Sequence, residues 1–366
     1  LAALEYECFR AVANGAGICV GDQLHPSGAL EESVYKRIGQ VFGRMEATEK
    51  WCRGFKKVAQ IGVYGTVRST QAVTNEVDLS IEGAYRSLTE LKYQFDIVDL
   101  TDPIDGYELL ILPDCVTLTP EAAQRIDAYV EKGGRLLATG HSAAGADGFQ
   151  LDCLPVQYQG EGLTAPRYMD IREGAFEGVP AMKTVAYSGG ARVSAKPGAT
   201  VLCETVDSYF DRAEAHFCSH RQTPPKTSGD GEPCAVVSER VAYVSNMLFM
   251  DLAEYGVKAY KDILGALIAR LLPQSLVQSD LPAYAEVTLR RLGEDTVAHV
   301  LNYIVQRKCK QLDTVEDVVP LYGRTLKIRL DKAPTSVKLL PGGEAVPFEY
   351  RDGYACLKPN ALDGRT

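Results

Sequence analysis

The sequence predicts an α/β protein whose central parallel sheet is followed by an all-β module. Strands alternate with helices from about residue 57 to 140, and a strand and a strong helix return within 241–271. Such alternation indicates a parallel sheet with helices on both faces. Beyond residue 275 short strands are separated by turns, which is typical of an antiparallel module.

The clearest strand–helix–strand unit begins with an apolar run at residues 107–112, as expected for a buried parallel strand. Thr119 and Pro120 then predict a helix start, with a hydroxyl N-cap and a proline at the first helical position. Gly133-Gly134 ends this helix at about residue 132, and residues 135–139 supply the next strand.

The other elements follow from the same periodicities. Further parallel strands are expected at 58–64, 95–100 and 241–249, and helices at 80–92 and 253–271, the latter capped by Asp251. Residues from about 145 to 235 are rich in glycine and proline and predict an irregular insertion, in which 184–187 and 200–205 are candidates for short strands. Short strands of the last module are expected at 285–289, 296–304, 325–330, 336–340 and 354–357.

Composition excludes several classes of function. The chain has 366 residues, enough for two or three domains, and a net charge of −9 that argues against nucleic acid or an anionic membrane as partner. No apolar run reaches the roughly 20 residues of a transmembrane helix. Ten cysteines are scattered without any C-x-x-C pair, which indicates reduced thiols in a cytoplasm. Because the chain has no initiating Met, we interpret it as part of a longer protein.

The first candidate site lies near the N-terminus. Residues 15–22 resemble a strand, and a long helix follows from about Glu31, so Asp22, Gln23 and His25 would lie at the carboxyl end of that strand. In a (β/α) barrel this end carries the active site. A carboxylate, an amide and an imidazole suit sugar hydroxyls, although a capping Asp and a surface His are equally compatible with the sequence.

The second candidate site is the segment that contains His216, Cys218, His220 and Arg221. On a strand, the first three side chains would share one face, as metal ligands could. A structural zinc site needs four ligands, and no fourth lies nearby, so we predict no metal and no cofactor. A long loop follows as far as Pro233, and such loops are often functional. We expect it to reach over a neighbouring site, and a plain surface loop is the alternative.

Cys115 follows a strand, as the nucleophile of class I glutamine amidotransferases does. That nucleophile requires glycines on both sides of a strained turn. Here Pro113-Asp114 precedes the cysteine and Val116-Thr117 follows it, so the turn is absent and a buried small side chain is expected. The segment 140–145 resembles a hydrolase elbow but has the wrong glycine spacing.

Four segments together resemble a known family. Residues 21–26, 61–63, 112–140 and 216–225 are similar to the latter half of multidomain glycoside hydrolases of the β-galactosidase and α-L-fucosidase-like type. The resemblance implies the end of a catalytic barrel, a β-galactosidase trimerisation domain of flavodoxin-like (class I glutamine amidotransferase-like) fold with a doubly wound parallel sheet, and a C-terminal β-domain.

The resemblance also implies domain boundaries. Residues 1–52 would be the final βα unit of a truncated (β/α)8 TIM barrel, and residues 53–276 the flavodoxin-like trimerisation domain. Residues 277–366 would form a β-sandwich-like module. Glycoside hydrolysis needs two carboxyl groups. In this family they come from earlier barrel strands, so no catalytic acid or nucleophile is assigned, and Asp22, Gln23, His25, His216, His220 and Arg221 are expected to bind substrate.

The expected function is therefore the accessory and oligomerisation portion of an intracellular glycoside hydrolase. Its substrate would be a β-galactoside or an α-L-fucoside, and its partner another copy of itself, a trimer by the family's name. A non-catalytic carbohydrate-binding or assembly protein and an amidotransferase-like enzyme are the alternatives. Neither nucleic acid nor a membrane is an expected partner.

Overall fold

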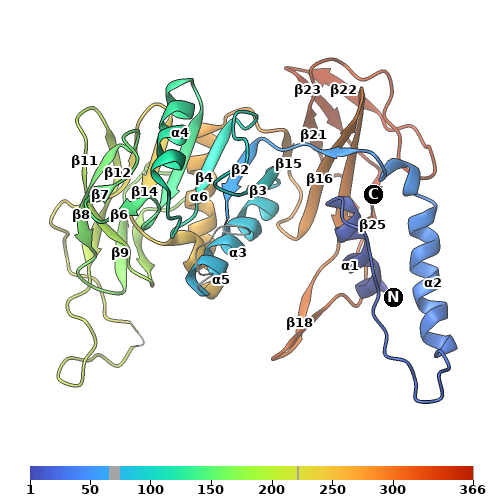
Figure 1. Cartoon of the computed structure of the whole chain (residues 1–366), viewed down its shortest axis with the longest axis horizontal. Helices are drawn as coiled ribbons and strands as arrows, with labels where there is room; N and C mark the ends of the chain where they lie inside the picture. The colour runs from blue at the N-terminus through green and yellow to red at the C-terminus, as the bar shows by residue number, and fades with distance from the viewer. Residues whose placement is uncertain (66–74, 221, 366) are drawn as a thin grey trace. The chain divides into compact units, whose positions relative to one another are not determined.

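A computed structural model describes residues 1–65, 75–220 and 222–365 of the chain (Figure 1). They form two compact units. The α/β unit comprises Gln60–Leu88 and Phe95–Gln274, and the β unit comprises Leu1–Ala59, Thr89–Gln94 and Ser275–Thr366. The domain boundaries expected from the sequence, 1–52, 53–276 and 277–366, stay predictions.

The α/β unit is built on a mixed sheet, which in the described residues has nine strands in the order β10-β9-β12-β13-β14-β5-β4-β2-β3. The half from β14 to β3 is parallel, as predicted. Its strands are β2 (Ile61–Tyr64), β3 (Phe95–Val98), β4 (Leu109–Leu112), β5 (Arg135–Thr139) and β14 (Val241–Val244).

Helix α4 (Pro120–Glu131) connects β4 to β5 and has the predicted cap. The Thr119 hydroxyl accepts a hydrogen bond from the backbone N–H of Ala122 at 3.2 Å. The apolar stripe of α4, which includes Ile126, packs in one core with Leu110 and Leu112 of β4. All four residues of β4 are buried, because helices cover both faces of a doubly wound sheet.

Helix α3 (Asn75–Glu90) lies on the other face. The connection from β2 to β3 and the connection from β4 to β5 run in opposite directions across the sheet, so right-handed crossovers place α3 and α4 on opposite faces. A Cβ atom at Gly83 of α3 would lie 1.8 Å from the carbonyl oxygen of Phe249. Glycine at this position therefore permits the close approach of α3 to α5 (Leu248–Tyr255).

The end of the α/β unit differs from the prediction. The strand expected over 241–249 ends at Val244, and the helix expected over 253–271 is two helices, α5 and α6 (Lys258–Leu271). Gly256 separates them with a φ of +64°, the left-handed conformation that glycine adopts most easily. Asp251 lies in the first turn of α5 and is not a cap, so that prediction was wrong.

The insertion at 145–235 contains the two short strands predicted at 184–187 and 200–205, as β10 and β12, but the rest of it is more regular than predicted. Four of its strands, β9, β10, β12 and β13, extend the central sheet with antiparallel pairing. β8 and β11 pair with each other, and β6 and β7 form a small hairpin. The bounds are β6 (Ala144–Gly145), β7 (Gly148–Phe149), β8 (Val156–Glu161), β9 (Arg167–Ile171), β10 (Met182–Ala186), β11 (Ala191–Ala195), β12 (Thr200–Asp207) and β13 (Pro233–Val237).

The last module is antiparallel, as predicted. Two four-stranded sheets, β1-β16-β17-β25 and β15-β21-β23-β22, share one apolar core. The expected strand at 336–340 is absent from the described chain, since Lys338 makes only an isolated bridge, and β22 was missed. The bounds are β1 (Lys56–Lys57), β15 (Val277–Ser279), β16 (Ala285–Leu292), β17 (Asp295–Asn302), β18 (Gln306–Cys309), β19 (Leu312–Thr314), β20 (Leu321–Tyr322), β21 (Leu326–Arg329), β22 (Phe348–Arg351), β23 (Tyr354–Leu357), β24 (Ala361–Leu362) and β25 (Gly364–Arg365).

The N-terminal segment belongs to the β unit. Helix α1 (Ala2–Ala13) buries Phe9 beside Leu301, and its Arg10 pairs with Glu286 at 3.0 Å. Helix α2 (Glu32–Glu46) forms as predicted, and a short 3-10 helix, η1 (Glu49–Trp51), follows. The strand expected at 15–22 was wrong: these residues are mostly exposed and pair with no strand in the described chain, and an isolated strand leaves its backbone groups unpaired.

Candidate functional site

The first predicted group lies in one exposed loop of the β unit. The carboxylate of Asp22 accepts a hydrogen bond from the Gln23 backbone at 2.8 Å. The Nδ1 atom of His25 lies 2.8 Å from the Ser27 hydroxyl. The three side chains are exposed, and Asp22 also lies within hydrogen-bonding reach of the Tyr35 hydroxyl on α2. The three residues are close only because they are near neighbours in the sequence. They follow an extended segment that is not a strand.

The second predicted group lies in the α/β unit, on an exposed excursion after β12. His216 makes two backbone hydrogen bonds with Ala213, and its ring lies 5.7 Å from that of Phe210. The segment is not a strand, so the expected common face for His216, Cys218 and His220 was wrong. No cluster of three metal-ligating side chains occurs among the described residues. Arg221 lies outside the described residues.

A buried carboxyl group that the sequence did not predict lies at the carboxyl end of β4. Asp114 is fully buried and adopts a left-handed φ of +51°. Its carboxylate accepts hydrogen bonds from the Thr139 hydroxyl at 2.5 Å and from the Met250 backbone at 2.6 Å. Burial raises the pKa of Asp114 to about 7, and the hydrogen bonds from Thr139 and Met250 oppose that rise. The neighbouring Cys115 is half-buried rather than buried.

Asp251 is a second carboxyl group of this kind. It accepts hydrogen bonds from the backbone of Tyr187 at 2.7 Å and from the hydroxyl of Ser188 at 2.5 Å. Burial raises the pKa of Asp251 to about 6. Asp251 therefore joins α5 to the turn before β11, and Asp114 joins the end of β4 to α5. Because both carboxyl groups are buried, they stabilise the fold and do not contact substrate.

The insertion holds a buried arginine. The guanidinium of Arg167 on β9 is fully buried and pairs with Asp207 at 2.9 Å and with Glu232 at 2.8 Å. Arg192 on β11 lies 3.5 Å from the second oxygen of Glu232. Two carboxylates around one guanidinium compensate the loss of hydration that burial imposes on each charge.

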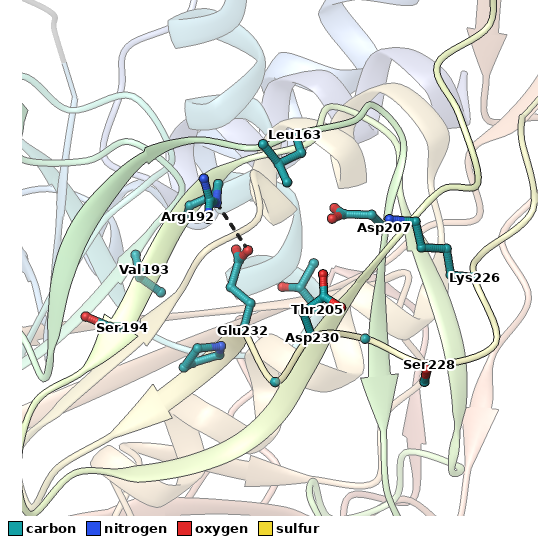
Figure 2. A pocket seen from close by; sticks show the side chains of 13 residues that line it. Leu163, Arg192, Val193, Ser194, Thr205, Asp207, Lys226, Ser228, Asp230 and Glu232 are labelled. Carbon is teal, nitrogen blue, oxygen red and sulfur yellow. Dashed lines mark ion pairs between the residues drawn. The ribbon is translucent and has the colours of Figure 1, made fainter.

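A cavity of about 280 Å³ opens beside this cluster (Figure 2). Three carboxylates, two cationic side chains and three hydroxyls line it, together with glycine backbone and a few apolar groups. The charged and hydroxyl side chains are those of Asp207, Asp230, Glu232, Arg192, Lys226, Ser194, Thr205 and Ser228. This lining offers hydrogen-bond donors and acceptors at close spacing, which suits a small polar ligand.

Sequence analysis missed this site for a physical reason. Its charged residues come from three strands and a loop between residues 167 and 232, and each resembles an ordinary surface charge in its own segment. One signal was available. Arg167 begins a strand whose other residues, Tyr168 to Ile171, are mostly buried, and an arginine in such a pattern needs a partner.

A family model described as the beta-galactosidase trimerisation domain matches residues 66–274, more than half of the chain. The chain belongs to the beta-galactosidase trimerisation domain family. The match confirms the resemblance found in the sequence. The trimerisation domain contains Asp114, the cavity and the segment of His216 and His220, whereas Asp22, Gln23 and His25 lie outside the matched range.

Solved structures resemble the whole chain, trimerisation domain included. Alpha-L-fucosidase isoenzyme 2 from Paenibacillus thiaminolyticus is similar over 100% of this chain and 56% of its own, with a TM-score of 0.92 and 28% identity. A beta-galactosidase from Rahnella sp. R3 is similar over 100% of this chain and 51% of its own, with a TM-score of 0.64 and 15% identity. At that identity the galactosidase shows the fold alone.

A curated relative matches a short part of the chain. Beta-galactosidase BglY of Alicyclobacillus acidocaldarius is 36% identical over 55 residues, which are 15% of this chain and 8% of BglY. The chain thus spans about half the length of the two solved relatives and a small part of BglY. Within the described ranges, no helix is long and apolar enough to cross a membrane.

Proposed function

We propose that this chain is the oligomerisation and accessory portion of a glycoside hydrolase, and that it assembles with copies of itself as a trimer. The observation that carries this proposal is the match of residues 66–274 to the trimerisation domain family. The likeness to an alpha-L-fucosidase over the whole chain supports the same assignment.

The substrate of the whole enzyme is proposed to be a β-galactoside or an α-L-fucoside, because both activities occur in the names of the similar proteins. Cleavage needs an acid and a second carboxyl on opposite sides of the glycosidic bond. The buried Asp114 and Asp251 are occupied by neighbouring donors and do not fit these roles. The proposal therefore places both catalytic carboxyls in residues outside this sequence.

We further propose that the parallel half of the sheet is flavodoxin-like. Numbered along the chain, its strands β2, β3, β4, β5 and β14 lie in the order 2-1-3-4-5, which is the flavodoxin order. The class I amidotransferases share this scaffold, but Cys115 lacks the glycines that their nucleophile requires. Both points favour a domain whose role is structural rather than catalytic.

The substrate-binding role of Asp22, Gln23, His25, His216, His220 and Arg221 stays a proposal. Its support is the exposure of the two histidines on a long excursion from the sheet. In the full-length enzyme, Arg221→Ala is expected to lower kcat/KM. The decrease should correspond to a loss of about 1–3 kcal/mol of transition-state stabilisation. Arg240→Ala, on the turn between β13 and β14, is the matched control. Unchanged kinetics in both variants would mean that the segment is a surface loop without a role in substrate binding.

A cytoplasmic location completes the proposal. All ten cysteines are free thiols, including Cys203 and Cys234 on neighbouring strands. Proteins of reducing compartments keep thiols in this state, whereas secreted proteins usually pair them.

Two measurements test the proposal. Sedimentation analysis of the 366-residue chain at micromolar concentration should show a trimer, and a monomer would contradict the oligomerisation role. Assays with nitrophenyl galactosides and fucosides should show turnover by the full-length enzyme and none by this chain. Turnover by the chain itself that is lost in Asp22→Asn would place a catalytic carboxyl here instead.

A further inference from the structure

The cavity beside Arg167 has polar groups left over after its structural ion pairs are formed. Thr205 is 2% exposed, and among the described residues its hydroxyl has no hydrogen-bond partner. The Cys234 thiol lies beside it, but sulfur is a weak acceptor. The Nε atom of Arg192 makes no hydrogen bond, but it lies 3.5 Å from Glu232 Oε2 and is therefore ion-paired. Buried polar groups are normally satisfied, so the Thr205 hydroxyl indicates a missing hydrogen-bonding partner.

The charges around the cavity balance. Asp207, Asp230 and Glu232 supply three carboxylates, and Arg192, Lys226 and the underlying Arg167 supply three cations. The site as a whole therefore carries no net charge that would attract an anion or a cation. A hydroxyl group both donates and accepts, so a neutral ligand with many hydroxyls matches closely spaced carboxylates, ammonium and guanidinium groups.

The volume limits the size of that ligand. About 280 Å³ lies just below the range of roughly 300–1,000 Å³ that is typical for drug-sized ligands. The apolar lining is limited to Leu163, Val193 and Pro233, which is too little to hold an apolar molecule of this size. The cavity therefore suits a small polar molecule and not a lipid or an extended polymer.

We propose that this cavity is a non-catalytic binding site for a neutral mono- or disaccharide, in which the Thr205 hydroxyl binds a ligand oxygen. The preference for a neutral polyhydroxylated ligand follows from the lining, whereas its identification as a saccharide rests on the proposed function. Such a site would bind substrate or product sugar on the insertion and would take no part in the hydrolysis step.

Saturation-transfer NMR on the 366-residue chain tests the site with galactose, fucose and lactose as probes. At least one sugar should give a saturable signal at millimolar concentration. Thr205→Val, which keeps the shape and removes the hydroxyl, should weaken binding about five-fold, the effect of one lost hydrogen bond. Equal affinity in the wild type and in Thr205→Val would overturn the proposal, as would no saturable binding of any of the three sugars.

Thr184→Val is the matched control. Thr184 lies on β10 in the same sheet, is 5% exposed, and also has a hydroxyl without a partner in the described chain, but it does not line the cavity. Sugar affinity should be unchanged in this variant. Equal weakening in both variants would mean that the loss reflects the fold and not the cavity. If Thr205→Val fails to fold, Thr205→Ala, which also removes the hydroxyl, gives the same test.

Inorganic phosphate and Lys226→Gln separate a sugar site from an anion site. Phosphate should not displace the sugar, and Lys226→Gln should weaken sugar binding by no more than about five-fold, since one charge-assisted hydrogen bond to a neutral ligand becomes a neutral one. Displacement by phosphate would overturn the proposal. A failure of the proposed function would be seen in other experiments, as a monomeric chain in sedimentation or as an inactive full-length enzyme. It would not change the result of this sugar titration.

Discussion

Arg167 and Asp114 are two fully buried ionisable groups of the same α/β unit, held in opposite ways. Arg167 lies between two carboxylates, those of Asp207 and Glu232. Asp114 receives its hydrogen bonds from neutral donors, the Thr139 hydroxyl and the Met250 backbone. Opposite charges compensate the burial of the first group, whereas burial favours the protonated form of the second.

The difference shows what burial demands of each group. A guanidinium cannot lose its proton in a protein, so its burial requires carboxylates nearby. A carboxyl group can take up a proton, so neutral donors suffice and its pKa rises instead. Removal of Arg167 should therefore destabilise wherever its two carboxylates are charged, whereas the effect of Asp114 should depend on its own titration.

The largest effect is expected for Arg167→Met. The change leaves the carboxylates of Asp207 and Glu232 without their shared cation and should lower the free energy of unfolding by about 3–5 kcal/mol. Urea denaturation followed by circular dichroism measures it. Arg172→Met, which removes an exposed pair with Glu204, should change stability by less than about 1 kcal/mol. Equal effects of the two changes would mean that burial does not matter here.

Asp114→Ala is expected to lower the free energy of unfolding by about 3 kcal/mol at pH 5, because Met250 N–H loses its acceptor and alanine must adopt a left-handed φ. Asp352→Ala is a matched control, since Asp352 has a φ of +54° but an exposed side chain. Its effect isolates the backbone strain. A loss in Asp114→Ala no larger than in the control would show that the buried hydrogen bonds contribute nothing.

The pH dependence gives a further test. The pKa of Asp114 is about 7 in the folded chain and near 3.8 when unfolded, so the folded state binds the proton more tightly and stability falls as pH rises from about 4 to 7. Asp114→Asn cannot titrate and tolerates the left-handed φ. Relative to wild type, Asp114→Asn should gain about 2–3 kcal/mol of stability between pH 5 and pH 8. If the free energies of unfolding of wild type and Asp114→Asn change with pH in parallel, the pKa of Asp114 is not raised.

The smallest effect is expected for Asp251→Asn, because the pKa of Asp251 rises only to about 6. The same comparison with wild type should give a gain of about 1–2 kcal/mol, complete by pH 7 rather than pH 8. Chemical denaturation at pH 5, 6, 7 and 8 resolves the two windows. The pH at which half of the gain has appeared should be lower for Asp251→Asn than for Asp114→Asn. The opposite order would contradict the assigned pKa values.

The sequence predicted those parts whose signals are local. Thr119, Pro120 and Gly133-Gly134 define helix α4 by themselves, and the apolar run of β4 marks a buried strand. Strand β9 could not be predicted in this way, because its Arg167 is buried only by virtue of partners 40 and 65 residues away. Asp114 was recognised only as the end of a strand, since its burial depends on α5, more than 130 residues later.

The place of the insertion also has a consequence for synthesis of the chain. Strand β5 ends at Thr139, but its neighbour β14 begins only at Val241, about 100 residues later. At roughly 5–20 residues per second, the ribosome needs about 5–20 seconds to deliver that neighbour. During this interval β5 is an unpaired edge in the nascent polypeptide, open to pairing with another chain. The insertion, whose antiparallel strands lie close in sequence, can fold first and wait for β14 to join both halves of the sheet.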